Sequence, residues 1–100
     1  MALFIRLSRL TEKANQNLQN MDQMVEQARQ IIEANGARIL HAYVILGEYD
    51  VLTVMEAPDE KTAAKIGALI ATQGNFRAET LAAIPVEEFI GSLKAKVPEE

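Results

Sequence analysis

The sequence predicts an α+β fold of the ferredoxin-like type, with the element order βαββαβ, a four-stranded antiparallel sheet and a short C-terminal helix. Two apolar stretches with strand-like composition meet at a glycine-containing turn near the middle of the 100-residue chain. A strand-like and then a helix-like stretch precede this hairpin, and a helix-like and then a strand-like stretch follow it. This symmetry about a central hairpin is the split βαβ plan.

Four stretches are typical of β-strands because apolar side chains alternate along them or run together. They cover residues 2–9, 37–46, 51–57 and 75–84. Gly47 supplies the backbone freedom that the turn between the second and third strands needs, and Asp50 is expected to bind nearby backbone amides. Pro85 ends the fourth strand.

Three stretches have helical spacing and cover residues 20–36, 59–73 and 86–96, after a short helical lead-in at 11–18. Asn20 and Gln23 have the spacing of a capping box, and Asp59 is the expected N-cap of the second helix. Gly36 and Gly74 suit helix C-terminal caps. Residues 1–97 are expected to form one domain, with 98–100 as a frayed tail.

The composition excludes several classes of protein. Apolar residues make up 49% of the chain, so a core of ordinary size is available. A net charge of −4 without a basic cluster argues against nucleic acid or an anionic membrane as partners. The absence of cysteine excludes disulfides, thiolate nucleophiles and zinc–cysteine sites. Neither a signal peptide nor a membrane-length apolar run is seen, so a cytoplasmic location is expected.

Alternation along the strands predicts which side chains face the helices. The expected core face of the sheet carries Leu3, Ile5, Leu7, Leu40, Ala42, Val44, Leu46, Leu52, Val54, Phe76, Ala78, Thr80, Ala82 and Ile84. The second face would then carry Phe4, Ile39, Tyr43, Ile45, Val51, Met55 and Leu81, too much apolar surface for a solvated sheet. Burying five such side chains contributes about 7–15 kcal/mol before association costs, so we expect a homodimer, or an assembly of dimers, with sheets face to face.

The same second face is expected to hold most of the polar candidates. They are Arg6, Ser8, His41, Tyr49, Thr53, Arg77 and Glu79. Of these, Arg6, Tyr49 and Arg77, together with Asp50 of the turn, are candidates for binding a ligand. Arg77 and Glu79 are two residues apart on one strand and form either an interfacial ion pair or a site in which Arg77 binds a carboxylate and Glu79 works as acid or base, with Arg6 joining them.

His41 and Glu79 are the candidate catalytic residues. His41 is the only histidine, and its ordinary pKa near neutrality suits a general base, although a partly buried structural histidine is the commoner explanation. One histidine cannot build a multi-histidine metal site, and Glu79 or Asp50 as co-ligands lack a ligand spacing, so no metal or other cofactor is expected.

Four motifs in order give the chain a resemblance to a known family. They are Ser8-Arg9-Leu10-Thr11, Leu46-Gly47-Glu48-Tyr49-Asp50, Glu56-Ala57-Pro58-Asp59 and Gly74-Asn75-Phe76-Arg77-Ala78-Glu79-Thr80-Leu81. With them the chain resembles the GYD-domain family of the dimeric α+β barrel superfamily. The resemblance implies the fold and a dimer but no activity, because the superfamily includes cofactor-free monooxygenases, isomerases, haem enzymes and effector-binding domains.

Three functions are compatible with these residues. The leading hypothesis is a dimeric module that binds or senses a small molecule in a cleft near the hairpin and the start of the fourth strand. The alternative is a cofactor-free oxygenase or isomerase, with His41 or Glu79 as base and Tyr49 or Arg77 stabilising an oxyanion. The third is a purely structural assembly domain.

Overall fold

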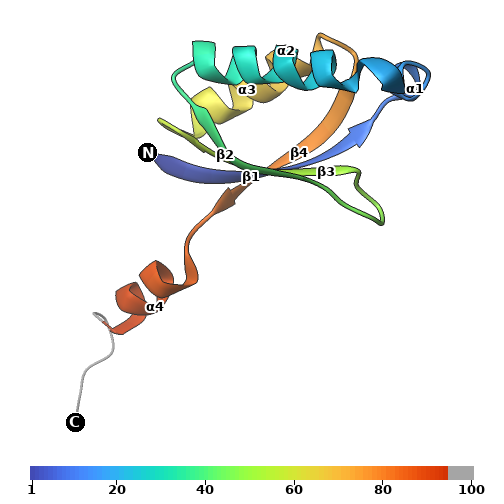
Figure 1. Ribbon diagram of the computed structural model, residues 1–100. Helices are drawn as coiled ribbons and strands as arrows, with labels where there is room; N and C mark the ends of the chain where they lie inside the picture. Colours follow the sequence, from blue (N-terminus) through green and yellow to red (C-terminus); the bar gives the residue numbers. More distant parts are fainter. Residues whose placement is uncertain (95–100) are drawn as a thin grey trace.

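The computed structural model describes residues 1–94 as a four-stranded antiparallel sheet with helices on one of its faces (Figure 1). The order of elements is βαββαβ with a further helix at the end, as the sequence predicts. The strands are β1 (Ala2–Leu10), β2 (Arg38–Val44), β3 (Val51–Ala57) and β4 (Phe76–Ala83). The helices are α1 (Glu12–Asn15), the 3-10 turn η1 (Leu18–Asn20), α2 (Met21–Ala34), α3 (Glu60–Ala71) and α4 (Val86–Lys94). The predicted helix end at 96 and the tail at 98–100 lie outside the described residues.

The sheet has the strand order β2-β3-β1-β4, so β1 and β3 are central and β2 and β4 form the edges. All three pairings are antiparallel. The register between β2 and β3 shifts between Ile39 and His41, which leaves Leu40 as an extra residue on β2. This β-bulge changes the face on which the following side chains of β2 lie.

The helix starts agree with the sequence at one of two predicted caps. Asp59 caps α3, because its side chain accepts a hydrogen bond from the backbone N–H of Thr62 at 2.8 Å. The predicted capping box at Asn20 is wrong: α2 does begin after Asn20, but the Asn20 side chain makes no capping hydrogen bond. The side chain of Thr11 instead caps α1 by accepting from the backbone N–H of Ala14.

Three glycines, Gly36, Gly47 and Gly74, occupy backbone conformations with positive φ that other residues rarely adopt. Gly36 has a φ of 77° and follows α2, where the N–H of Ala37 donates to the carbonyl of Ile32 at 3.2 Å in a Schellman motif. The predicted glycine cap of α2 is therefore confirmed. Gly47 has a φ of 118° in the turn between β2 and β3. A Cβ atom there would have no neighbour within 4 Å, so the backbone conformation, and not a lack of space, favours glycine.

The face that α2 and α3 cover is not the one that the alternation predicts for β1 and β3. Phe4 and Met55 are 3% and 0% exposed, and both pack in the core with Ile66 of α3 and Ile32 of α2. The assignment of Leu3, Ile5, Leu7, Leu52 and Val54 to the core is therefore wrong, and Phe4, Ile39, Val51 and Met55 lie on the helix side instead. The assignment for β4 is correct, because Phe76 is buried in the same core.

Polar residues on the helix side explain this error. Arg6 and Ser8 are each 4% exposed and Thr53 is 9% exposed, so the middle of the covered face is polar. Counting apolar residues selects the other side of β1, which carries three aliphatic side chains and fewer polar ones. The correct assignment depends on pairing partners that only the folded sheet provides.

The other face of the sheet, which we call the open face, has an apolar centre and polar edges. Neither α2 nor α3 covers it (Figure 1). Its cross-strand rows from β2 to β4 are Tyr43, Leu52, Leu7 and Glu79; then His41, Val54, Ile5 and Leu81; then Arg38, Glu56, Leu3 and Ala83. An ion pair joins Arg38 to Glu56 at one corner. An uncovered apolar face is thus present, as the sequence predicts; Tyr43 and Leu81 lie on it as expected, whereas its central residues on β1 and β3 are the ones that were assigned to the core.

Helix α4 lies apart from both layers of the fold, beyond the end of β4 (Figure 1). None of its residues is buried. Its four large apolar side chains are between 44% and 66% exposed, and they are Val86, Phe89, Ile90 and Leu93. The described part of the chain therefore leaves α4 without an apolar partner.

Candidate functional site

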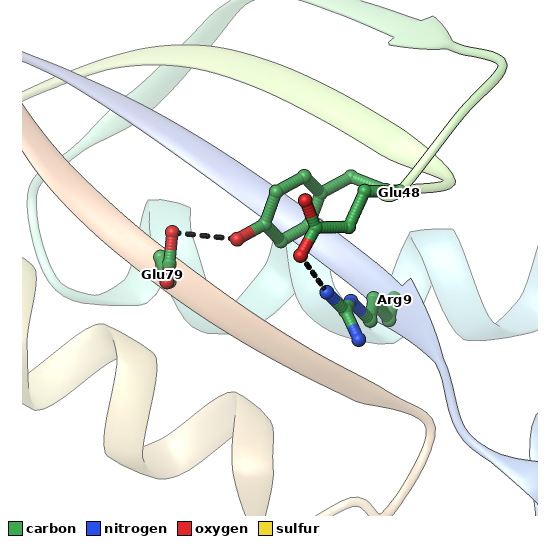
Figure 2. A network of polar contacts seen from close by, with 4 residues as sticks. Arg9, Glu48 and Glu79 are labelled. Atoms are coloured by element: carbon green, nitrogen blue, oxygen red, sulfur yellow. Dashed lines mark hydrogen bonds and ion pairs between the residues drawn. The ribbon is translucent and has the colours of Figure 1, made fainter.

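The turn between β2 and β3 brings four polar side chains together at one end of the open face. The Tyr49 hydroxyl donates a hydrogen bond to Glu79 Oε2 at 2.8 Å, which joins the turn to β4. Arg9 at the end of β1 donates from Nη2 to Glu48 Oε1 at 2.6 Å, and its guanidinium carbon lies 4.9 Å from the centre of the Tyr49 ring. In Figure 2, Arg9 lies beside Glu48, and Glu79 lies on the neighbouring strand β4. Dashed lines mark the Arg9–Glu48 and Tyr49–Glu79 contacts. We call these four residues the turn cluster.

The turn cluster is a set of paired groups. The hydrogen bond to Glu79, followed by partial desolvation and the negative charge of Glu79, raises the pKa of Tyr49 above its ordinary value of 10.0. A tyrosine with a raised pKa is a hydrogen-bond donor at neutral pH and not a base. The arrangement therefore suits holding the turn on the sheet and presenting polar groups to a partner.

Asp50 anchors the turn to β1. Its Oδ2 accepts from the backbone N–H of Leu10 at 2.9 Å, and its own N–H donates to the carbonyl of Ser8 at 2.8 Å. Its carbonyl accepts from the N–H of Ile45 at 2.9 Å and closes the turn. The prediction that Asp50 binds backbone amides is confirmed, and one oxygen of its carboxylate is already engaged within the chain.

His41 and Glu79 lie on the two edge strands, β2 and β4, with β3 and β1 between them. Neighbouring strands are about 4.8 Å apart, so the two backbones are separated by about 14 Å. His41 stacks on Tyr43, with ring centroids 6.2 Å apart and 19° between the planes. One chain therefore does not bring the two candidate bases to a common substrate. Within residues 1–94, no three His, Asp or Glu side chains gather closely enough to hold a metal ion.

Arg6 lies on the opposite side of the sheet from the turn cluster, beneath α3. Its Nη1 donates to Thr80 Oγ1 at 3.5 Å, and a Cβ atom placed on Gly67 of α3 would lie 3.4 Å from the same nitrogen. Burial lowers the pKa of Arg6 from its ordinary 12.5, although a guanidinium stays charged at neutral pH. The predicted grouping of Arg6 with Glu79 is therefore wrong, because the sheet separates the two side chains, whereas Arg6 and Arg77 line the same groove beside α3.

Arg77 shares a face of β4 with Glu79, as the alternation predicts. The predicted ion pair between them does not form among the described residues, since Glu79 accepts from Tyr49 instead. Arg77 lies at the edge of the sheet and lines both a shallow pocket beside the turn cluster and a groove next to α3. It is the candidate residue that borders both sides of the fold.

Two cavities meet at Arg6. One has a volume of about 150 Å³, lies between α2 and the sheet, and is lined mainly by apolar side chains such as Val25, Ile32 and Phe76. The other is a wider groove of about 680 Å³ beside α3, which we call the α3 groove. Its lining includes Arg6, Lys13, Gly67, Phe76, Arg77 and Thr80. The sequence predicted a ligand cleft near the hairpin and the start of the fourth strand, and the α3 groove borders the latter only.

The sequence reasoning missed four residues of these sites. Arg9 and Glu48 complete the turn cluster, and Gly67 and Thr80 surround Arg6. Glu48 directly precedes Tyr49 in the turn, so the sequence alone could have identified it as a neighbour of the candidate site. The contacts across strands require the register of the sheet, which alternation alone does not provide.

Within residues 1–94, none of the helices combines the length and the apolar composition that a bilayer crossing requires.

Comparison with known proteins gives one family match and one curated relative at high coverage. The family model described as "GYD domain" matches residues 4–93. A protein of Thermus thermophilus, named "Glutamine synthetase and cystathionine beta-lyase binding protein", is 36% identical over 95 residues. The aligned region is 94% of this chain and 100% of the relative.

Solved structures show the same fold at lower identity. The crystal structure of FFRP-DM1 has a TM-score of 0.58 at 19% identity, over 84% of this chain and 100% of that one. The crystal structure of TTHA0845 from Thermus thermophilus has a TM-score of 0.56 at 18% identity, over 85% of this chain and 95% of that one.

Proposed function

This chain belongs to the GYD domain family, and from that premise we propose that it is a protein-binding module that acts as a homodimer. The observation that carries the proposal is the relative from Thermus thermophilus, whose name states that it binds glutamine synthetase and cystathionine beta-lyase. The 36% identity extends over the full length of that relative, so the two chains share an entire fold and not one motif. We therefore extend protein binding, as a class of function, to this chain.

The open face is the surface that we propose for the contact between two copies of the chain. Its apolar centre and polar edges have the anatomy of a protein interface. Ile5 and Val54 lie in the central row, between the exposed side chains of His41 and Leu81 at the two edges. A monomer that left this face in water would lose the burial free energy of its aliphatic side chains.

The area of the open face explains why α4 is expected to take part. Four strands at about 4.8 Å spacing and seven residues at about 3.3 Å each cover a footprint of about 450 Å². A specific interface of standard size buries about 800 Å² on each partner. The exposed apolar side of α4, which includes Phe89 and Ile90, supplies further surface, so we propose that each α4 packs on the other copy.

The dimer is tested by measuring molar mass with light scattering at micromolar concentration. The wild-type chain is expected to have the mass of a dimer. Ile5→Lys places a charge in the central row of the open face and is expected to give a monomer. Gln27→Lys adds the same charge on the exposed side of α2 and is expected to remain a dimer. A wild-type monomer at these concentrations would contradict the proposal.

The binding function is tested with glutamine synthetase and cystathionine β-lyase purified from the organism that encodes this chain. With the chain immobilised, at least one enzyme is expected to bind saturably with a Kd below about 10 µM. An unrelated enzyme of similar size and charge serves as the control. No saturable binding of either enzyme at about 100 µM would overturn the proposal. The Ile5→Lys variant then reports whether the partner recognises the dimer or the single chain.

A further inference from the structure

We propose that Arg6 forms the floor of a binding site for a small carboxylate-bearing molecule in the α3 groove. This site lies on the helix side of the sheet, away from the open face. The inference does not depend on the protein-binding function proposed above. It rests on the unmet hydrogen-bonding capacity of Arg6, the access that Gly67 gives to it, and the charge of the groove.

The guanidinium of Arg6 has more N–H donors than hydrogen-bond acceptors around it. An arginine side chain carries five N–H donors. Within residues 1–94, Arg6 makes one side-chain hydrogen bond, to Thr80 at the long distance of 3.5 Å, and no ion pair. The residue is 4% exposed. Because a buried charge is costly without a counter-charge or a full set of hydrogen bonds, an anionic acceptor bound here would be strongly favoured.

The remaining nitrogens of Arg6 are accessible from the cavities. No side-chain nitrogen or oxygen in the described part of the chain is both fully buried and without a hydrogen-bond partner. The Arg6 nitrogens that lack a partner therefore keep some exposed surface, and Arg6 lines both the cavity under α2 and the α3 groove. Nη1 carries two N–H donors, only one of which is needed for Thr80, and it lies beside Gly67 in the lining of the α3 groove.

The thinness of α3 keeps this access open. Gly67 and Ala71 form the wall that α3 contributes to the groove. A Cβ atom on Gly67 would lie 3.4 Å from Arg6 Nη1 and 3.7 Å from Thr80 Oγ1, at the point where a ligand oxygen would meet both groups. Gly67 is therefore the residue whose missing side chain leaves room at the guanidinium.

The groove favours an organic anion. Its charged lining residues are three cations, Arg6, Lys13 and Arg77, and one acid, Glu12. A carboxylate is planar and accepts two parallel hydrogen bonds from a guanidinium. Phe76, which also lines the groove, offers apolar surface to a short carbon skeleton. A molecule with one or two carboxylates and a few carbon atoms matches both features.

The test is a nuclear magnetic resonance titration of the full chain with sodium succinate and, separately, sodium acetate at constant ionic strength. The Nε–Hε resonance of Arg6 is the reporter, because it belongs to the guanidinium whose Nη1 lies at the proposed contact. A saturable shift is expected with succinate, with an apparent Kd at or below about 1 mM. Inorganic phosphate is titrated in parallel to separate a carboxylate site from a general anion site.

Gly67→Ala is the decisive variant. Alanine favours the helix more than glycine does, so α3 is expected to keep its fold while the added methyl group narrows the site. The apparent Kd for succinate is expected to rise by about tenfold or more. Gly91→Ala in α4 is the matched control, since a Cβ there meets nothing within 4 Å, and it is expected to bind succinate as the wild type does. Arg6→Lys keeps the charge but loses the planar fork and is expected to bind about tenfold more weakly.

Three results would overturn the proposal. The first is the absence of a saturable shift of Arg6 with succinate or acetate at about 20 mM. The second is a Gly67→Ala variant that is folded and binds succinate with unchanged affinity. The third is a tighter interaction with phosphate than with either carboxylate, which would assign the groove to another class of ligand. A failure of Arg6→Lys to fold leaves the first two criteria in force.

Discussion

A sheet with helices on one side is expected to have an apolar covered face and a polar uncovered face. In this sheet the centres of the two faces have the reverse polarity. The face that the helices cover has Arg6 and Thr53 at its middle, whereas the uncovered face has Ile5 and Val54 there. The covered face buries its large apolar residues toward the ends of the strands, as Phe4 does. Polarity along a strand therefore does not by itself identify the side that helices cover, because here the buried centre of the sheet is polar.

The largest expected effect on stability comes from replacing two adjacent residues of β3, one on each face of the sheet, by alanine. Met55→Ala removes a fully buried side chain and is expected to lower the free energy of unfolding by about 2–5 kcal/mol. Val54→Ala, on the open face, is expected to cost about 1 kcal/mol in a dilute single chain. Chemical denaturation at several protein concentrations measures both.

Measurements at several protein concentrations distinguish a face that a second copy covers from a face that is buried within one chain. If a second copy covers the open face, the cost of Val54→Ala is expected to grow as the protein concentration rises, because association stabilises the folded state. The cost of Met55→Ala is expected to change less. A Val54→Ala cost that equals that of Met55→Ala at every concentration would mean that the open face is buried within the single chain.

A smaller effect is expected at Asp50, which ties the turn to β1. Asp50→Ala removes the acceptor for the N–H of Leu10 and is expected to cost about 1–3 kcal/mol in thermal or chemical unfolding. Asp50→Asn keeps an acceptor oxygen in the same place and is the control, with a smaller expected loss. Equal losses in the two variants would assign the effect to charge and not to this hydrogen bond.

The smallest expected effect is a pH-dependent one in the turn cluster. The folded-state pKa of Tyr49 is raised, so its contribution to stability is present below 10.0 and is lost as the pH rises through the folded-state pKa. Tyr49→Phe is therefore expected to lower the melting temperature at pH 7–9, and this difference is expected to shrink progressively as the pH rises above about 10. Calorimetry across this pH range measures it.

Glu79→Gln provides the control for the turn cluster. It keeps an acceptor for the Tyr49 hydroxyl but removes the charge, and it is expected to bring the tyrosinate absorbance transition of Tyr49 to lower pH. A difference between wild type and Tyr49→Phe that stays constant from about pH 7 to 11 would contradict the assigned cause.

The sequence was sufficient for features that depend on local chemistry. The Gly36 and Asp59 caps, the bounds of β3 and the order of the elements follow from residues that are close together in the chain. Features that depend on strand partners were not accessible in this way. The stacking of Arg9 on Tyr49 and the placement of Arg6 under α3 both require the register of a sheet whose pairs are far apart in sequence.

The extra residue in β2 sets the phase of the alternation along an edge of the sheet. Because Leu40 is inserted in the register, Ile39 and Ala42 lie on the helix side while His41 and Tyr43 lie on the open side. In a regular ladder without this bulge, Leu40 would pair with Val54, and the imidazole of His41 and the phenol of Tyr43 would lie on the helix side of the sheet. One backbone insertion thus decides which chemical groups border the open face, with every neighbouring side chain left unchanged.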